Sequence, residues 1–403
     1  MDIFHDNPLF SGVRQMLGAF AKQQMRPIAM KHDTEESMPW DLMRSAQALG
    51  MTQSAMQDGR KKLTGVEDDP DPKKPRTMAR LGVAASEELA WGCAGIALAL
   101  GGSGLAASPV SRMGNDEQKA EFKKLLSGND EHGRIRVAAM ALSEPGTGSD
   151  ISGLKTSARR DGDHHWIIRG SKQWITNGQS ASVFVVWAQT EPDAGRAGVR
   201  GFIVGRGTPG LVPGKKETKL GIRASETAQV HFEDVRVHGD MMLGVGGESA
   251  GLADTKKMLD STRPMVGAQA TGIARAAYEF LLDRVRGGSL HGTPMASHQH
   301  IMFELADMAM EIHAARLMAH KAAWMADHHI ENVMESSMAK AYGARVAQAV
   351  TNRAMVLLGE EALEPGHPVE KWYRDAKIYD IFEGTGQIQR RIIAKQLTGQ
   401  NPT

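Results

Sequence analysis

Residues 166–187 read WIIRGSKQWITNGQSASVFVVW, and this stretch decides the fold class of the chain. Aromatic and β-branched residues gather near its two ends, in the runs 166–168 and 183–187. Such residues favour the pleated, partly buried surface of a β-strand. Similar runs follow at 201–204 and 230–237. We expect these runs to pair as a small antiparallel sheet.

The hydrophobic period changes to that of a helix on both sides of the predicted sheet. Apolar residues have helical spacing from about Leu9 to Gly50 and again from Met78 to Leu126. Beyond about Gly247 a helical stripe repeats every three or four residues, formed by Ile301, Leu305, Met308, Ile312, Ala315, Ala319 and Ala322. This order of helices, sheet and helices lacks the strand–helix alternation of a doubly wound fold.

The sequence therefore predicts a mainly α protein with a β middle domain. We place an N-terminal α-helical domain at residues 1–135, a middle β domain at 136–246 and a C-terminal α-helical bundle at 247–403. A chain of 403 residues is long enough to bury a substantial core in such an arrangement.

Charge and composition exclude several classes of function. The 48 Lys and Arg nearly cancel the 47 Asp and Glu, so no field gathers nucleic acid or an anionic membrane. The single cysteine, Cys93, excludes an internal disulfide and suits a reducing compartment. The most apolar run, 94–107, is too short to span a membrane, and residues 1–12 lack a secretory pattern. We expect a cytoplasmic protein, or a mitochondrial-matrix protein in a eukaryote.

The common nucleotide and metal motifs do not occur in the sequence. No G-x-G-x-x-G opens a helix, and no Walker-type Gly-Lys-Ser/Thr is found. The histidine pairs at 164–165 and 328–329 lack the i, i+4 spacing of a zinc hydrolase. We therefore predict no bound metal.

The candidate functional residues are concentrated in three segments, 142–150 (LSEPGTGSD), 172–177 (KQWITN) and 374–385 (RDAKIYDIFEGT). The first is a turn whose amides and hydroxyls could bind polar ligand atoms, or simply a tight turn. The second ends a strand, where side chains often face a ligand, although a packed Trp with a capping Thr is the alternative. In the third, apolar neighbours raise the pKa of Glu383, which suits a general base, unless Glu383 is a helix N-cap or ion-pair partner.

These segments resemble the acyl-CoA dehydrogenase family, medium-chain type, along nearly the whole chain. The resemblance implies an N-terminal helical domain, an antiparallel β-barrel-like domain and a C-terminal four-helix bundle that together bind FAD. It also implies α,β-dehydrogenation of an acyl-CoA thioester to trans-2-enoyl-CoA. Glu383 would remove the α-proton while flavin N5 takes hydride from the β-carbon. The Glu383 amide and a ribityl hydroxyl of FAD would stabilise the thioester oxygen.

The resemblance assigns further residues to FAD and to the substrate. Ser143, at a position where the family usually has Thr, would bind the flavin ring. Trp174 would cover the flavin face, and the Thr176 hydroxyl would lie beside N5. The remaining FAD contacts implied are Met140, Leu142, Gly148, Ser149, Ile175, Gln299, Thr385 and Gln387. The substrate contacts implied are Ser149, Asp260, Arg263 and Gly384, although Asp260 and Arg263 could equally be a plain helix ion pair.

Several positions depart from the family pattern. Residues 288–292 read GSLHG, so Gly288 replaces an Arg that reaches a neighbour's FAD. Residues 356–360 read VLLGE, so Val356 and Glu360 replace parts of a Gln-x-x-Gly-Gly motif with the same function. Gln299, another contact across that interface, remains. We expect a homotetramer or homodimer and keep a heteromer with a paralogue as the alternative.

Other departures concern the substrate. Residues 51–77 replace a Pro- and Gly-rich stretch, and the small Ala97 and Gly101 predict a deeper cavity for long or bulky acyl groups. Some relatives place the base within the segment that here reads 260–264 (DSTRP), where neither Ser261 nor Thr262 can replace it.

Electron-transfer flavoprotein is the electron acceptor that the resemblance implies. The nearest alternative is an acyl-CoA oxidase that gives electrons to O2. A non-catalytic or scaffolding paralogue is a further alternative, against which the intact Glu383 and the balanced charge argue.

Overall fold

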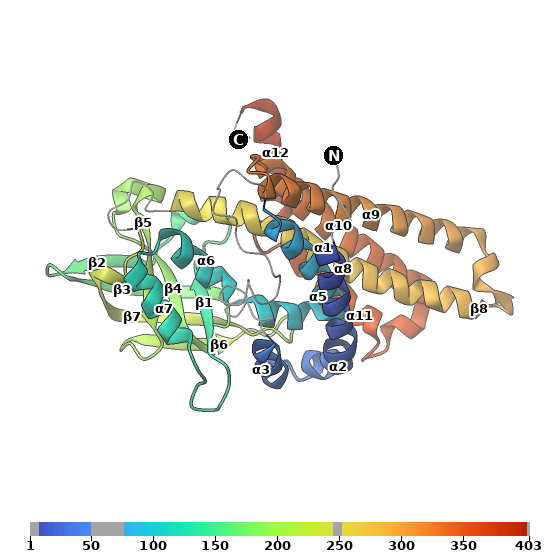
Figure 1. Cartoon of the computed structure of the whole chain (residues 1–403), viewed down its shortest axis with the longest axis horizontal. Coiled ribbons are helices and arrows are strands. Elements are labelled where there is room, and N and C mark those ends of the chain that lie inside the picture. Colours follow the sequence, from blue (N-terminus) through green and yellow to red (C-terminus); the bar gives the residue numbers. More distant parts are fainter. Residues whose placement is uncertain (1–7, 50–75, 245–251, 401–403) are drawn as a thin grey trace.

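The computed structural model describes residues 8–49, 76–244 and 252–400, with the side chains of the helix beginning at Leu252 described from residue 261 onward. The molecule is elongated, with a β-sheet at one end and long helices at the other (Figure 1). The N-terminal helices, which lie beside both parts, are α1 (Pro8–Phe20), a π-helical turn (Ala21–Met25), α2 (Arg26–Thr34), α3 (Trp40–Ala48), α5 (Met78–Gly101), α6 (Gly104–Met113) and α7 (Asp116–Leu126). The predicted order of helices, sheet and helices is confirmed.

The middle part forms a seven-stranded sheet in the order β1-β4-β2-β3-β7-β6, with β5 paired to β4. Its strands are β1 (Val137–Ala141), β2 (Ser157–Asp161), β3 (His165–Thr176), β4 (Ala181–Gln189), β5 (Val199–Gly205), β6 (Leu211–Lys216) and β7 (Thr227–His238). The runs predicted as strands lie within β3, β4, β5 and β7.

The predicted runs pair antiparallel, β3 with β7 and β4 with β5, but the sheet as a whole is not antiparallel, because β1 pairs with β4 in parallel and β2 meets β4 in parallel at Ser157 and Gln189. Parallel neighbours need a long connection, and the chain between β1 and β4 includes both β2 and β3. The sheet is therefore mixed.

Strand β4 explains why 183–187 is apolar without alternation. Phe184 and Val186 pack into the cluster on one face of the sheet, and Val183, Val185 and Trp187 into the cluster on the other face. Successive side chains of a strand point to opposite faces, so a strand covered on both sides is apolar throughout. Helices α6 and α7 contribute Ala106, Val110 and Phe122 to the second cluster.

The C-terminal part is a bundle of α8 (Leu252–Gly287), α9 (Gln299–Asp327) and α10 (Val333–Leu358). The strands β8 (Ser289–Leu290) and β9 (Thr293–Pro294) lie between α8 and α9, and the helices α11 (Pro368–Ala376) and α12 (Gly386–Thr398) follow α10. Every residue of the stripe predicted from Ile301 to Ala322 is buried, which confirms α9 as a bundle helix.

Helices α8 and α10 approach each other unusually closely. A Cβ added to Gly267 of α8 would lie 2.6 Å from the Ala339 carbonyl oxygen, and one added to Gly343 of α10 would lie 2.6 Å from the Gly267 carbonyl oxygen. Backbones come this near only where side chains are absent. The close contact lets side chains of both helices reach the same loop, at 381–385.

Helix α5 crosses the molecule and is broken at Cys93, whose extended backbone interrupts the helical hydrogen bonds. The Arg26 guanidinium donates to the Trp91 carbonyl near the break at 3.1 and 3.3 Å and lies 3.6 Å above the Trp91 ring. Helix α5 is long and apolar enough to cross a membrane, but 72% of its most apolar window is buried inside the protein. It therefore occupies the position of a core helix.

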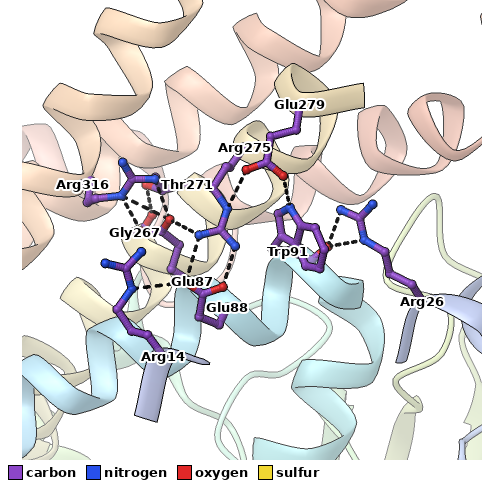
Figure 2. Close-up of polar contacts among 10 residues, drawn as sticks. All are labelled: Arg14, Arg26, Glu87, Glu88, Trp91, Gly267, Thr271, Arg275, Glu279 and Arg316. Carbon is purple, nitrogen blue, oxygen red and sulfur yellow. Dashed lines mark hydrogen bonds and ion pairs between the residues drawn. The ribbon is translucent and has the colours of Figure 1, made fainter. Parts of the chain in front are cut away.

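A buried ion network fastens α5 to α8 and α9 (Figure 2). Glu87 of α5 accepts from Arg316 at 2.7 Å and from Arg275 at 2.9 Å, and Glu88 accepts from Arg275 at 2.6 Å. Burial by itself raises the pKa of Glu87, but the Arg316 hydrogen bond and the two guanidinium charges lower it below the usual range. The carboxylate of Glu87 is thus charged at neutral pH and holds three helices together.

Candidate active site

The turn 142–150 is held rigidly against strand β3. The Gln173 amide donates to the Ser143 carbonyl at 2.9 Å. Below this contact the buried Lys172 ammonium lies 2.9 Å from the Glu144 carboxylate and 2.9 Å from the Leu142 carbonyl. Glu144 also accepts from the Lys155 and Thr156 amides, both at 2.8 Å. Two of the three predicted segments are therefore joined through a pair of residues, Glu144 and Lys172, that sequence reasoning assigned no role.

The protonation of this pair follows from its surroundings. Burial lowers the pKa of Lys172 to about 8, with Glu144 opposing the shift. Burial alone would raise the pKa of Glu144, but Lys172 and the main-chain donors outweigh it and lower the pKa. Both groups are charged at neutral pH, so the ion pair is intact there.

Trp174 interrupts β3 and points outward. The register between β3 and β7 shifts between Lys172 and Ile175, and Trp174 has φ +62°, which is unfavourable for a bulky side chain. Its indole is 57% exposed, whereas Ile175 is 2% exposed and lies in the core of the sheet. Bulges that re-aim a side chain in this way are common beside functional sites. A contact from Ile175 to FAD would have to come from its main chain.

The end of β3 meets the end of α5. Asn177, with φ +62°, donates through its side chain to the Ala138 carbonyl at 3.0 Å. A Cβ added to Gly102 would lie 3.1 Å from the Thr176 methyl group, and one added to Gly95 would lie 3.1 Å from the Ala224 side chain. Neighbouring segments therefore pack closely against α5 and its C-terminal end at these two glycines.

Glu383 lies in a short loop between α11 and α12. Its carboxylate accepts a hydrogen bond from the Thr262 hydroxyl of α8 at 3.0 Å. Burial raises the pKa of Glu383, while the Thr262 hydrogen bond and the charges of Arg263 and Lys340 act against the shift. The alternative in which Glu383 caps a helix is wrong, because Thr385 caps α12 by accepting from the Ile388 amide at 3.2 Å.

The main chain of this loop is held by its carbonyl groups. Gln389 donates to the carbonyls of Glu383 and Gly384 at 3.2 and 3.0 Å, and Lys340 donates to the Gly384 carbonyl at 2.6 Å. Within the described parts of the chain, the Glu383 amide meets no hydrogen-bond acceptor. That amide remains available to a ligand oxygen.

The other predicted site residues differ in their exposure to solvent. Gly148, Ser149 and Gln387 are exposed, and Arg263 is buried, whereas the side chain of Asp260 is outside the described residues. Ser143, Leu142 and Met140 are partly buried at the end of β1. Residues 51–75, most of the substituted stretch, also lie outside the described residues.

Gln299 begins α9 next to the β8–β9 hairpin, at the end of the bundle remote from the sheet (Figure 1). The departing positions Gly288, Val356 and Glu360 lie near the ends of α8 and α10. None of these four belongs to the site formed by β3 and the Glu383 loop of the same chain.

Helix α5 connects the two halves of the site. Leu98 packs in the same cluster as Phe382, the residue before Glu383, and Gly102 packs on Thr176. Among residues 8–49, 76–244 and 252–400, no cluster of His, Cys, Asp or Glu is placed to hold a metal ion. These residues provide a carboxylate of raised pKa, an amide without an acceptor among the described residues and an outward-facing indole.

Comparison with known proteins identifies the family of the chain. Residues 139–235 match the family model described as acyl-CoA dehydrogenase, middle domain, and residues 249–398 match the acyl-CoA dehydrogenase C-terminal domain. The short-chain specific acyl-CoA dehydrogenase of Bos taurus mitochondria is 37% identical over 96% of this chain and 89% of its own length. The chain therefore belongs to the acyl-CoA dehydrogenase family. It is an oxidoreductase of the FAD-dependent, acyl-CoA dehydrogenase type.

Solved structures extend the comparison. Butyryl-CoA dehydrogenase from Megasphaera elsdenii has a TM-score of 0.86 and 30% identity, covering 98% of this chain and 99% of that one. A glutaryl-CoA dehydrogenase from Mycobacterium smegmatis in complex with FADH2 has a TM-score of 0.85 and 25% identity, covering 99% and 98%. A prolyl acyl carrier protein oxidase has a TM-score of 0.85 and 27% identity, covering 97% and 99%. Dehydrogenases and an oxidase thus share this fold.

Proposed function

We propose that the protein oxidises a short-chain acyl-CoA thioester at its α,β-bond, with Glu383 as the base. The observation that carries the proposal is the Glu383 loop. Its carboxylate has a raised pKa and a hydroxyl partner in Thr262, and its amide has no acceptor among the described residues. One residue thus offers a proton acceptor and a hydrogen-bond donor within a few ångströms.

The residues around β3 fit a bound flavin. A half-exposed Trp174 held in a bulge offers an aromatic face, and the exposed turn at Gly148 and Ser149 offers polar atoms. With Ser143, Thr176, Thr385 and Gln387, these residues would hold FAD, and Gln299 would reach the FAD of a second subunit. When bound, FAD supplies the hydride acceptor.

The residues of the chain supply the proton chemistry. Glu383 takes the α-proton, and its raised pKa brings the basicity of the carboxylate closer to that of the reacting carbon. The Thr262 hydroxyl keeps one carboxylate oxygen in place. The Glu383 amide donates to the thioester oxygen, where negative charge develops as the proton leaves. Arg263 and Asp260 would contact the CoA part, and Gly384 the acyl thioester.

The proposed substrate differs from the long or bulky acyl group predicted from Ala97 and Gly101. Ala97 is buried in a cluster with residues of α1 to α3, so its small side chain does not enlarge a substrate cavity. Gly101 is exposed, and a Cβ there would meet no atom within 4 Å. The short-chain specific and butyryl-CoA relatives support a short substrate.

The partners are proposed from the same comparisons. Electron-transfer flavoprotein is the proposed acceptor, and the oxidase neighbour keeps O2 as the alternative. Exposed apolar side chains on α9, at Met302, Phe303 and Met310, support a homotetramer or homodimer, because patches of this kind commonly mark subunit contacts. A heteromer would explain the substitutions at Gly288 and Glu360. The mitochondrial relatives support a matrix location in a eukaryote, and a cytoplasmic one otherwise.

Anaerobic bleaching of the bound flavin tests the proposal. We expect butyryl-CoA to bleach the purified protein faster than octanoyl- or palmitoyl-CoA. Glu383→Gln should keep the FAD content of the wild type but lose bleaching by roughly three orders of magnitude or more, because proton abstraction needs the carboxylate. Rapid bleaching by this variant would show that another base acts. Hydrogen peroxide released in air would identify an oxidase.

A further inference from the structure

Lys340 lies beside the Glu383 loop, although neither a motif nor the mechanism above requires it. It lies on α10 with its side chain fully buried. Its ammonium donates to the Gly384 carbonyl at 2.6 Å. A lysine in a helix interior costs free energy to bury, so its retention there calls for a specific function.

The position of Lys340 follows from the close packing of α8 and α10. Gly267 of α8 contacts the backbone of Ala339, the residue next to Lys340 in the chain. This contact places the Lys340 side chain and the Thr262–Arg263 turn of α8 beside the same loop. The base is consequently surrounded by groups from two helices that approach at van der Waals distance.

The loop that Lys340 contacts has an unfavourable backbone. Glu383 has φ +56° and Gly384 has φ +91°, and a non-glycine residue in the left-handed region costs about 1 kcal/mol or more. Such a conformation persists only where its surroundings fix it. Here the fixing contacts are the Lys340 ammonium and the Gln389 amide, which together hold the carbonyls of Glu383 and Gly384.

Lys340 also acts on the loop through its charge. Asp380 and Glu383 face it as negative groups, Arg263 faces it as a positive group, and burial lowers its pKa to about 8. Lys340 is therefore mostly protonated at pH 7. Its charge favours the ionised form of Glu383 and so opposes the burial that raises the pKa of the base.

We propose that Lys340 is the positioning residue of the Glu383 loop. Its ammonium holds the Gly384 carbonyl so that the carboxylate and the amide of Glu383 face the acyl thioester together, and its charge keeps the carboxylate ready to accept a proton. This assignment rests on the proposed function of Glu383 as the base.

Lys340→Met tests the assignment in the FAD-bound protein with butyryl-CoA. We expect full FAD content, a bleaching rate about tenfold or more below wild type, and a KM within about threefold, because misplacing a reacting group lowers rate more than binding. Losing the positive charge raises the pKa of Glu383, so the acidic limb of the rate against pH moves upward by about one unit. Lys340→Arg keeps the positive charge and the N–H donor. It should therefore restore part of the bleaching rate and part of the position of the acidic limb.

Lys219→Met is the matched control. Lys219 also donates to a main-chain carbonyl, that of Ser225, at 2.6 Å, and burial likewise lowers its pKa to about 8. Its charged neighbours are Lys216, Glu36, Glu226 and Arg223, none of which belongs to the Glu383 loop. We expect its acidic limb to match wild type. An equal shift in this control would overturn the assignment.

Lys340→Gln decides the matter if the Met variant does not fold. The amide keeps an N–H donor but carries no charge, so the acidic limb should still move upward while the rate falls less. Wild-type rate and an unmoved limb in either folded variant would refute the positioning role. Wild-type bleaching by Glu383→Gln would instead refute the base itself, so the two failures are distinguishable.

Discussion

Glu144→Gln should weaken FAD binding, although the side chain at position 144 of the turn 142–150 is buried. The wild-type carboxylate pairs with Lys172 at 2.9 Å and accepts from the amides of Lys155 and Thr156. The glutamine keeps the shape but leaves the Lys172 ammonium buried without a counter-ion, among neutral acceptors such as the Leu142 carbonyl. Breaking a buried ion pair typically costs about 3–5 kcal/mol.

Deprotonation of Lys172 sets a lower ceiling on that cost. Because burial already lowers the pKa of Lys172 to about 8 in the folded protein, removing its proton at pH 7 costs only about 1.4 kcal/mol, at 1.36 kcal/mol per unit. The unpaired charge cannot cost the variant more than this, because the neutral amine then replaces the ammonium. If the turn carries the loss, the Kd for FAD rises by about tenfold.

The ceiling also predicts an unusual dependence on pH. Each pH unit upward makes deprotonation of Lys172 about 1.36 kcal/mol cheaper, so FAD affinity of Glu144→Gln should recover toward pH 9. In the wild type Lys172 has a pKa of about 8, and raising the pH through that value discharges the ion pair. The difference between variant and wild type should therefore shrink as the pH rises.

Titration of the apoprotein with FAD, followed by flavin fluorescence between about pH 6 and pH 9, measures this effect. The double variant Glu144→Gln/Lys172→Met serves as the control, because it removes the unpaired charge and should recover part of the affinity. Affinity of the single variant within threefold of wild type at pH 7, or a deficit that does not shrink with pH, would refute the reasoning.

Two further substitutions test the base and the core. Thr262→Val removes the hydroxyl that favours the ionised form of Glu383, so the acidic limb of kcat/KM should move up by about half to one pH unit, whereas Thr262→Ser should leave it in place. Glu87→Gln should cost about 3 kcal/mol by removing a counter-ion from Arg275 and Arg316 (Figure 2), measured as a lower thermal midpoint. The exposed Glu121–Lys124 pair is its control, since Glu121→Gln should cost at most about 0.5 kcal/mol.

The pH dependence of the Glu87 contribution has a definite sign. Its pKa in the folded protein is below the value of about 4.3 expected for the unfolded chain. The stability it provides is therefore present above that value and is lost as pH falls through the folded pKa.

The elements in which the order of apolar and polar residues follows from local burial could be predicted from the sequence. The strand run at 183–187 is continuous in apolar residues because β4 is covered on both faces, whereas 230–237 mixes apolar and polar residues because its apolar side chains pack into a single cluster. The α9 stripe has the helical period because one side of the helix faces the bundle. Glu383 can be singled out as a candidate site residue because its carboxylate directly follows the apolar pair Ile381 and Phe382 within the segment 374–385.

Contacts between distant segments could not be predicted in this way. The parallel pairing of β1 with β4 depends on the path of the chain between them, which side-chain periodicity does not record. The outward turn of Trp174 depends on a bulge in the pairing of β3 with β7. Small residues at positions 97 and 101 suggest a cavity wall, and only packing shows that Ala97 is buried in the core and that Gly101 is exposed.

The sequence by itself determined the order of helices and strands, the family and the position of the proposed base, since each depends on a local pattern of residues. Tertiary structure alone decided what surrounds Glu383. Thr262 is separated from Glu383 by 121 positions, and Lys340 from Gly384 by 44. Buried polar groups must find partners wherever the fold brings them, so their pairing is set by the packing of α8 on α10 and not by neighbours in the chain.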